Sequence, residues 1–459
     1  MEYESDNNRI ATMLQLVSQS LLDVEIKDKA EDIPENEFEK DYKQYHFFQY
    51  ENLEHFSLSI GRFDALNSSH TAYTNSLVEF GKKAIYKIPK TADLIGDIYL
   101  KIKLPSLVTH PGYFKMYYVN SIANALIKEI TVKHGTDTIY NSTGQFLQIL
   151  SKYNTNASKQ QAVDSMSGTF HTEYSLVGNS NTYNEYYVCI PFWKTEKSRQ
   201  FFPTLHGLTV ADQLEVQIEF RTLKEIVSSE LTKDDEDTLT NNNDITIQIF
   251  ENVEQTGVQV FLNIQDQDFI ETSRCDNKFE ASLFVDHIYL SKEEKMLFLS
   301  KDLEYIIEQN TYEDYVLDTN GYSKMLLNFQ NPVKELIIVA FPSTDDNKEV
   351  NFQFRKLDSF EFYFNGRKRN ESRDTTTDAN QYLKLQNHIG IPNQYIYSYS
   401  FCLLPYDLQP TGTFNFSENP NNFILVKAKT DIKLTVRVYA IYYNIYEINQ
   451  QGFGRLRYT

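Results

Sequence analysis

Hydrophobic and polar residues alternate with a period of two along most of this chain. From Ile98 to Leu104, four aliphatic residues alternate with one tyrosine and two lysines. This alternation predicts a strand with one buried face and one wet face. Further strands are predicted at ALIKEITVKHG, YYVCIPFW, QLEVQIEFR, ITIQIFENV, VQVFLNIQ, ASLFVDHIYL, KELIIVAFP, FEFYFNGR, YIYSYSFCLLP and IKLTVRVYAIYYNIYEI. Many short strands separated by polar loops predict an all-β protein made of antiparallel sandwiches.

Helical periodicity is found mainly in two places. The first is near the start, at Ile10, Met13, Leu14, Val17 and Leu21, and an acidic stretch follows at 25–41. Two interpretations of residues 1–50 stay open: an amphipathic arm that docks on a partner, or a helix that caps its own domain. The second predicted helix begins with a capping box at Ser291 and Glu294. Its apolar stripe continues through Met296, Leu297, Leu303 and Ile306.

The strand pattern occurs twice in the same order. In the first half it runs IPKTADLIGDIYLKIKLP, IKEITVKHGTDTI and YYVCIPFWKTEKSRQFFPTL, and in the second half NFQNPVKELIIVAFP, SFEFYFNGRKRNES and YSFCLLPYDLQPTGTF. The repeat alone is a weak signal, but it indicates two copies of one sandwich. The polar stretch 228–244 is the predicted linker. We therefore expect an N-terminal arm at 1–50, a first sandwich at 51–228 and a second at 229–459.

Asp93 and Asp97, just before the strand that starts at Ile98, raise the question of a catalytic carboxylate pair. Acid–base catalysis needs two carboxylates held in different environments across a cleft, which sequence spacing cannot establish. Aspartate is common in turns, so we interpret both residues as a turn before the strand.

The net charge and the cysteine content bear on the partners of the protein and on the compartment in which it is made. Lys and Arg number 44 against 63 Asp and Glu, which gives a net charge of −19 and disfavours direct binding of nucleic acid. The cysteines, Cys189, Cys275 and Cys402, are far apart and favour a reducing compartment. The acidic N-terminus does not resemble a signal peptide, and no apolar run approaches ~18 residues, so we expect a soluble protein made in the cytosol.

Motifs for enzymatic chemistry are missing from the sequence. The nine histidines form no HxH, HExxH or Cys/His cluster, and neither a GxSxG elbow nor a phosphate-binding loop is present. QQGFGRLRY, at 450–458, only approaches GxGxxG, and His287 beside Asp286 is interpreted as a strand histidine rather than a base. We predict no catalytic, cofactor-binding or metal-binding residue, and no enzymatic activity.

Two further stretches suggest a binding surface. GRKRN at 366–370 and FFP at 201–203 could form a basic patch and an aromatic platform for nucleic acid or sugar. The favoured interpretation is a hairpin turn at Asn365 and Gly366 with solvated arginines, together with ordinary core phenylalanines.

Eight collinear stretches resemble the major capsid proteins of nucleocytoplasmic large DNA viruses, especially those of the iridovirus and ascovirus branch. They are MLQLVSQSLLDVEI, FGKKAIYKIPKTADLIGDIYLKIKLPSL, VNSIANALIKEITVKHGTDTI, LEVQIEFRTLKEIV, ASLFVDHIYLSKEEKMLFLSKDLEYIIEQ, NFQNPVKELIIV, IYSYSFCLLPYDLQPTGTFNFS and VRVYAIYYNIYEINQQGFGRLRY. The chain departs from the family at KHGTD, where a glycine pair is usual, and at 229–280, which looks longer.

The resemblance implies two consecutive eight-stranded antiparallel jelly rolls with short helices in the loops. It also implies a homotrimeric, pseudo-hexagonal capsomer that tiles an icosahedral shell. The implied partners are other copies of the chain, minor capsid and penton proteins, and the internal virion membrane through the N-terminal arm, without cofactor or nucleic acid. The implied location is the virion capsid, after synthesis in the host cytoplasm. One alternative is a double-jelly-roll scaffold for virion membrane assembly, and another is a sugar-binding sandwich.

Overall fold

The computed structural model describes residues 54–58 and most of 77–457. Its larger gaps are at 89–92, 108–113, 193–201, 204–213, 232–244, 289–295, 344–351 and 375–394. The predicted N-terminal arm, 1–50, lies outside the described residues. No helix among the described residues is long and apolar enough to cross a membrane.

The first sandwich has two antiparallel sheets. The β4 sheet contains β1 (Glu54–Leu58), β15 (Lys278–Ile288), β4 (Leu94–Leu104) and β8 (Asn184–Ile190), with β2 (Leu77–Glu79) and β9 (Phe202–Pro203) paired alongside. The β6 sheet contains β3 (Lys83–Lys87), β10 (Leu214–Phe220), β6 (Ile127–His134) and β7 (Asp137–Thr143). Their inward residues alternate with outward ones, as the sequence predicted.

The second sandwich has the same plan. The β18 sheet contains β16 (Leu303–Leu317), β25 (Leu434–Ile448), β18 (Pro332–Pro342) and β22 (Ile396–Ser400), with β23 (Phe414–Asn415) and β26 (Gly454–Leu456) alongside. The β19 sheet contains β17 (Gly321–Leu326), β24 (Phe423–Ala428), β19 (Ser359–Phe364) and β20 (Arg367–Lys368), with β21 (Arg373–Asp374) alongside.

Strand order is identical in the two sandwiches. Taken along the chain, β1, β3, β4, β6, β7, β8, β10 and β15 occupy the positions that β16, β17, β18, β19, β20, β22, β24 and β25 occupy in the second sandwich. Each sandwich therefore has two four-strand paths, which confirms the predicted pair of antiparallel jelly rolls. The repeated segments found in the sequence are β4, β6–β7 and β8 in one half and β18, β19–β20 and β22 in the other.

β15 follows the predicted border between residues 228 and 229 but belongs to a sheet of the first sandwich. β15 pairs with β4 along most of its length, from Glu280 opposite Lys103 to Ile288 opposite Leu94. The acidic stretch that suggested a linker, 228–244, lies mostly outside the described residues. We propose that the border between the sandwiches lies between Ile288 and Leu303.

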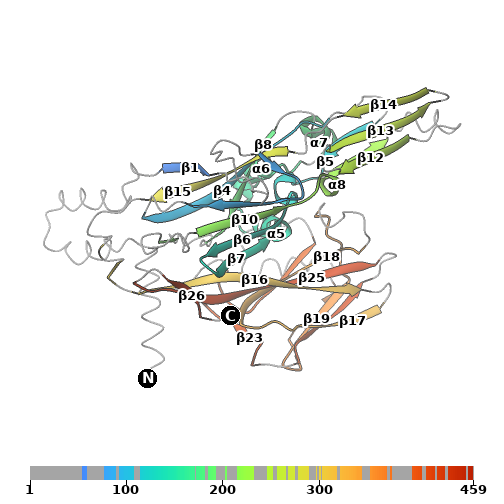
Figure 1. Cartoon of the computed structure of the whole chain (residues 1–459). Coiled ribbons are helices and arrows are strands. Elements are labelled where there is room, and N and C mark those ends of the chain that lie inside the picture. Colours follow the sequence, from blue (N-terminus) through green and yellow to red (C-terminus); the bar gives the residue numbers. More distant parts are fainter. Residues whose placement is uncertain are drawn as a thin grey trace, which may run out of the picture.

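Short helices and extra strands fill the connections, as predicted. The helices are α4 (Ile122–Ala125), α5 (Gly144–Tyr153), α6 (Ala157–Ser167), α7 (Glu173–Ser180) and α8 (Leu223–Ile226). β5 (Phe114–Tyr118) pairs with β11 (Val227–Leu231), and β12 (Ile245–Glu251), β13 (Thr256–Ile264) and β14 (Gln267–Ser273) form a separate sheet. This three-stranded sheet projects beyond the first sandwich at one end of the molecule (Figure 1).

The helix predicted from Ser291 does not continue as far as expected. A helical hydrogen bond joins Ser300 N to Met296 O, but Leu303 and Ile306 belong to strand β16. The capping box itself lies outside the described residues. The prediction failed because three consecutive residues, Tyr305, Ile306 and Ile307, are buried, and this interrupts the strict alternation that distinguishes a strand from a helix.

The turn predicted at Asp93 and Asp97 is only partly correct. Asp93 lies in a bend, but β4 already begins at Leu94, so Asp97 is inside the strand. The pairing with β15 shifts here, because the four residues from Ile95 to Ile98 lie opposite only three residues of β15, from Val285 to His287. The extra residue makes a β-bulge, which explains why this segment read as a turn.

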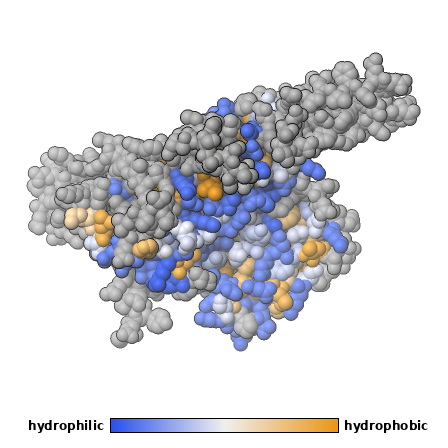
Figure 2. All heavy atoms as spheres, in the orientation of Figure 1, coloured by the Kyte–Doolittle hydropathy of each residue, from blue (hydrophilic) through white to orange (hydrophobic). Residues whose placement is uncertain are grey.

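Two hydrophobic cores hold the molecule together. One fills the first sandwich and continues to the β18 sheet through residues such as Tyr305, Ile337 and Tyr439, and the other fills the second sandwich. β18 is accordingly buried along nearly its whole length, whereas β19 alternates. Figure 2 shows the described surface as mostly hydrophilic, with small hydrophobic patches.

Candidate structural site: the joint between the sandwiches

The joint is the place where β7 and α5 of the first sandwich lie against the β18 sheet of the second (Figure 1). α5 starts directly after β7, because Thr143 caps it and accepts a hydrogen bond from Phe146 N at 3.2 Å. Gly144 allows this tight passage, since a Cβ there would lie 2.0 Å from Asn124 O and 2.3 Å from Ile127 O. The sequence STGQF therefore sets how α5 meets the second sandwich.

Amide side chains from β16 satisfy the open edge of β7. Gln309 Nε2 donates to Ile139 O at 3.0 Å, and Asn310 Nδ2 donates to Asn141 O at 2.7 Å. Gln309 Oε1 in turn accepts from Asn444 Nδ2 on β25 at 2.8 Å. The buried carbonyl of Ile139 needs such a partner, and the bond from Asn310 lies at the exposed end of the contact, so together they hold β7 against the second sandwich.

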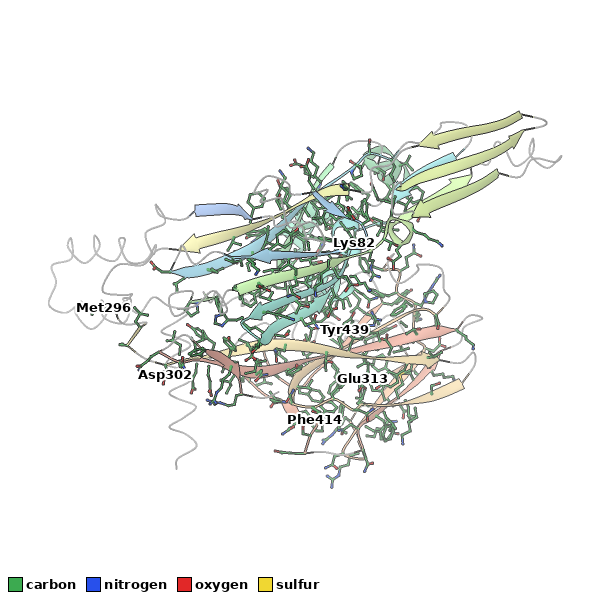
Figure 3. The ribbon with its side chains drawn as sticks, in the orientation of Figure 1. Lys82, Met296, Asp302, Glu313, Phe414 and Tyr439 are labelled. Atoms are coloured by element: carbon green, nitrogen blue, oxygen red, sulfur yellow. The ribbon has the colours of Figure 1, made fainter. Side chains whose placement is uncertain are left out.

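Arg437 brings a charge into the joint, and its partners neutralise it. Its guanidinium contacts both carboxylate oxygens of Asp314, at 2.7 and 2.8 Å, and donates to Gln145 Oε1 on α5 at 3.1 Å. Tyr439 donates to the same Gln145 oxygen at 2.7 Å, and its ring packs on Phe146 with the centroids 5.0 Å apart. Figure 3 places Tyr439 where the two sandwiches meet. The ion pair and the hydrogen bonds offset the free-energy cost of burying the Arg437 charge.

A second polar contact lies farther along the joint. His134 Nδ1, at the end of β6, and Tyr446 Oη on β25 share a hydrogen bond of 2.6 Å, and both residues are buried. Gly454 of β26 lies directly over this pair, because a Cβ there would come within 1.8 Å of Tyr446 Oη and 2.9 Å of His134 Nδ1. Gly454 thus allows β26 to pack closely on this pair.

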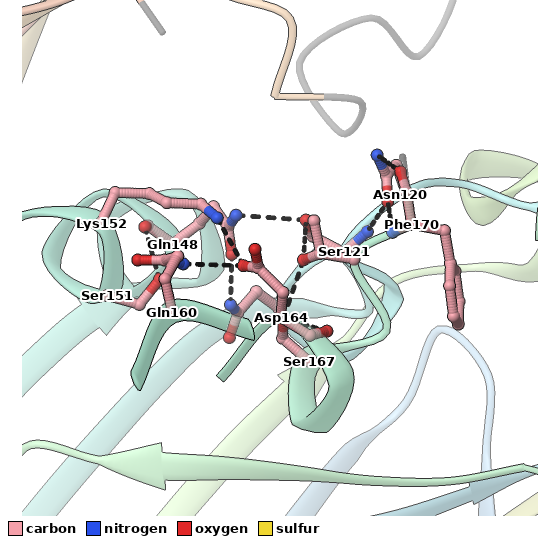
Figure 4. A network of polar contacts seen from close by, with 11 residues as sticks. Asn120, Ser121, Gln148, Ser151, Lys152, Gln160, Asp164, Ser167 and Phe170 are labelled. Carbon is pink, nitrogen blue, oxygen red and sulfur yellow. Dashed lines mark hydrogen bonds and ion pairs between the residues drawn. The ribbon is translucent and has the colours of Figure 1, made fainter. Parts of the chain in front are cut away.

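A polar network holds the helices that support the joint (Figure 4). Gln148 of α5 accepts from Asn124 Nδ2 at 2.6 Å and donates to Ser121 Oγ at 3.1 Å. Ser121 adopts a left-handed conformation, with φ of 56°, at the start of α4. The VNSIANALI segment, which carried part of the family resemblance, therefore holds α5 through Asn124 and Ser121.

Lys152 and Asp164 connect α5 to α6 in the same network. Lys152 Nζ lies 2.5 Å from Asp164 Oδ1, which also accepts from Gln160 Nε2 at 2.8 Å (Figure 4). The two ion-pair side chains are only 14% and 9% exposed, so water screens their interaction weakly. Asp164 O also accepts from Thr169 N, after the left-handed turn at Gly168 that ends α6.

A buried lysine ties three parts of the second sandwich together. Lys334 Nζ on β18 contacts Glu308 of β16 and donates to Pro405 O at 2.7 Å. Burial raises the pKa of the Glu308 carboxyl, and the neighbouring Lys334 opposes this only in part. The pair holds the loop after β22, where Leu403 is 72% exposed, against the body of the sandwich.

The residues considered as possible catalytic or binding residues are far apart or have structural roles. Asp93 lies just before β4 and Asp97 lies inside it, where Tyr99 donates to Asp97 Oδ2 at 3.0 Å. His287 lies in strand β15, as interpreted. Asn365 and Gly366, with φ of 51° and 69°, make the predicted hairpin turn between β19 and β20. Phe202 of the FFP stretch is buried, in line with the core interpretation.

No group of three or more histidine, cysteine, aspartate or glutamate side chains in the described part of the chain could hold a metal ion. The polar contacts of the joint connect the two sandwiches. Sequence reasoning missed its residues, although Gln309, Asn444 and Arg437 were detectable as polar residues within long apolar strands.

A family model described as "Major capsid protein N-terminus" matches residues 37–291, more than half of the chain. The major capsid protein of Pyramimonas orientalis virus is 25% identical over 413 residues, which cover 84% of this chain and 88% of that protein. The major capsid protein of Paramecium bursaria Chlorella virus 1 is 26% identical over 239 residues, which cover 39% of this chain and 54% of that protein.

Solved structures share the fold. PBCV-1 VP54 superposes with a TM-score of 0.64 at 18% identity, covering 89% of this chain and 96% of that one. The Faustovirus major capsid protein gives a TM-score of 0.53 at 11% identity, covering 97% of this chain and 98% of that one. On the strength of the family match and the shared double jelly roll, this chain belongs to the family of major capsid proteins of nucleocytoplasmic large DNA viruses.

Proposed function

We propose that three copies of this major capsid protein assemble into one capsomer with a pseudo-hexagonal outline, and that these capsomers tile an icosahedral shell. The observation that carries the proposal is the pair of sandwiches with one strand order, joined where the core of the first sandwich continues to the β18 sheet of the second. Three such chains supply six similar sandwiches, and a closed ring of copies joined head to tail removes exposed interfaces.

The rigidity of the joint supports this role. In a shell protein, the two sandwiches must keep a fixed position relative to each other so that the contacts on both can form together. A joint that combines buried hydrogen bonds, an ion pair and apolar packing resists bending. Gln145, Gln309 and Arg437 supply the polar part of that joint.

We extend the proposal to partners and location. Minor capsid and penton proteins would bind the assembled capsomers, and residues 1–50 would reach them or the internal membrane. The chain would be made in the host cytoplasm and would act without catalysis, cofactor or direct contact with nucleic acid.

Light scattering on the purified full-length chain tests the assembly. We expect a particle of three times the 53.7-kDa chain mass, and hexagonal arrays by negative-stain electron microscopy at higher concentration. A chain that stays monomeric at micromolar concentration across a range of salt contradicts the proposal. Trimers that form but are depleted from mature particles would favour the scaffold alternative.

A further inference from the structure

We propose that the N-terminal segment 10–21 docks as an amphipathic helix on an exposed apolar surface of its own chain. This surface, which we name the end patch, consists of Met296, Leu299 and Phe453. Of the two interpretations left open for residues 1–50, this docking is the one in which the segment caps its own chain. It requires no particular oligomeric state of the protein.

The first part of the end patch is the helical turn that precedes β16. Met296 and Leu299 are 65% and 44% exposed there, and Ser300 N donates to Met296 O at 3.0 Å. Figure 3 shows Met296 and Asp302 at the end of the molecule opposite the β12–β14 sheet, and Figure 2 shows hydrophobic side chains on the surface at that end. Covering such side chains with an apolar segment removes them from water and is therefore favourable.

The second part of the end patch is the turn between β25 and β26. Phe453 is 55% exposed in this turn, and its backbone N–H donates to Asn449 Oδ1 at 2.8 Å. Gln450 donates from its backbone to Asp302 Oδ1 at 2.9 Å and from its side chain to Ser300 O at 3.2 Å. These bonds hold the two turns side by side, which brings the exposed apolar side chains of both to one end of the molecule.

The arginines next to the end patch are paired within the chain. Arg455 Nε donates to Glu447 Oε2 at 2.9 Å, and Arg457 Nη2 donates to Glu304 Oε1 at 2.9 Å. Because a carboxylate neutralises each of them, these arginines contribute little attraction for an anionic ligand or an anionic membrane surface. The end patch therefore suits an apolar segment of protein better than an anionic partner.

The chain itself leads from the N-terminal segment to the end patch. The first described strand, β1, begins at Glu54, which pairs with His287 on β15. His287 precedes Met296 by nine residues, which span at most about 32 Å. Residues 22–53 can extend to about 110 Å, so they are long enough to bring residues 10–21 to the end patch. This connection makes the docking intramolecular and raises the effective concentration of the segment to the order of millimolar.

The sequence of residues 10–21 suits an apolar surface. Its apolar residues, Ile10, Met13, Leu14, Val17 and Leu21, recur at the spacing of one helix face. An isolated helix of this length is only marginally stable in water, so it needs an apolar surface on which to pack. The end patch is such a surface within reach of the segment, and residues 22–50 remain available to the partners proposed above.

Hydrogen exchange on the full-length protein tests the docking. We expect the backbone amides of residues 10–21 to exchange at least tenfold more slowly than those of an unstructured chain of the same sequence. Leu299→Asp should reduce this protection to less than threefold, whereas Leu403→Asp, a matched change of another exposed leucine, should retain it. Circular dichroism verifies that both variants fold. Residues 10–21 without protection in the wild type, or with full protection in Leu299→Asp, would overturn the inference.

Substitutions within the segment give an independent measurement. Leu14→Asp places a charge in the apolar stripe and should remove the protection of residues 10–21. Gln19→Asp is the matched control, because a helix places residue 19 on the face opposite the stripe, and this variant should retain the protection. Equal loss of protection in the two variants would contradict docking through the apolar stripe.

Photo-cross-linking identifies the surface that the segment binds. Leu14 is replaced by a photoreactive phenylalanine analogue, and equal amounts of ¹⁴N- and ¹⁵N-labelled chains are assembled together. We expect cross-links from position 14 to residues 296–299 or 453 within chains of one isotope. Cross-links between chains of different isotopes would assign the segment to a neighbouring copy and overturn docking on its own chain. Protection of residues 10–21 that appears only when vesicles of anionic lipid are added would overturn it in favour of a membrane.

Light scattering on the same samples separates this docking from the proposed function. Trimers whose residues 10–21 lack protection would overturn the docking and leave the proposed function standing. Monomers whose residues 10–21 are protected would contradict the proposed function and leave the docking standing.

Discussion

Gly454 shows how a single residue limits the joint. The chain passes so close to Tyr446 and His134 at this point that no side chain fits, although the backbone itself is in a strand. The constraint is therefore one of space rather than of backbone conformation. In the sequence, Gly454 was noted only as part of QQGFGRLRY, which approaches the GxGxxG motif.

Gly454→Ala should destabilise the protein by about 1–3 kcal/mol, because the added methyl group must displace Tyr446 or separate it from His134. Thermal unfolding followed by circular dichroism measures the change. Gly178→Ala in helix α7 is the matched control, since a Cβ at that position would have no neighbour within 4 Å and alanine favours a helix by about 1 kcal/mol. Equal effects of the two substitutions would argue against the close packing at the joint.

Glu308 should give the protein a characteristic pH dependence. Burial raises its pKa in the folded state, so the folded state holds a proton at pH values where the unfolded state has released it. The stability from this group is fully present below the unfolded-state pKa of about 4.3 and is lost as pH rises through the higher folded-state pKa.

Comparison of the wild type with Glu308→Gln measures that contribution, because glutamine cannot titrate. Chemical unfolding between pH 4 and pH 8 should show the wild type losing stability relative to the variant as pH rises. A wild type that gains stability relative to the variant over this range would show that Lys334, rather than burial, dominates the Glu308 environment.

At the scale of elements, the Lys152–Asp164 pair connects α5 to α6. Asp164→Ala leaves Lys152 in a largely buried position without its carboxylate, which should cost about 3 kcal/mol. Hydrogen exchange should report the loss mainly at residues 157–167. Lys101→Ala is the control, since its pair with Glu185 is more exposed and should contribute less than about 1 kcal/mol. Uniform exchange changes across both sandwiches would contradict a local role.

Most strands could be predicted from alternation, because one face of each is wet. β4, β10 and β19 show this pattern, and the Asn365–Gly366 turn was recognisable from its residue types. β16 was mistaken for a helix because Tyr305, Ile306 and Ile307 are all buried, which interrupts the alternation. Alternation likewise could not assign β15 to the first sandwich, since it identifies a strand but not the strand that pairs with it.

The site was less predictable than the fold. The sequence excluded familiar catalytic patterns but gave no direct sign that Gln145 and Arg437, 292 residues apart, lie together. Such contacts depend on how the two sandwiches pack against each other, and local sequence does not encode that packing. A polar residue inside an apolar strand was the available signal.

At the scale of the whole molecule, the apolar packing at the joint predicts cooperative unfolding. Because the core of the first sandwich extends to the β18 sheet, exposing one sandwich also exposes apolar surface on the other. Differential scanning calorimetry of the full-length chain should therefore show one transition that includes both sandwiches. Two well-separated transitions would indicate that the joint does not couple them.

The repeat of one strand order within the chain is the central feature of the molecule, because it makes a three-chain assembly with six similar positions geometrically natural. Cryo-electron microscopy of the purified assembly tests this most directly. We predict a threefold particle in which six sandwich-sized densities alternate around the ring and give a pseudo-hexagonal outline. A particle without threefold symmetry, or one whose two sandwiches per chain do not both lie in the ring, would contradict the account.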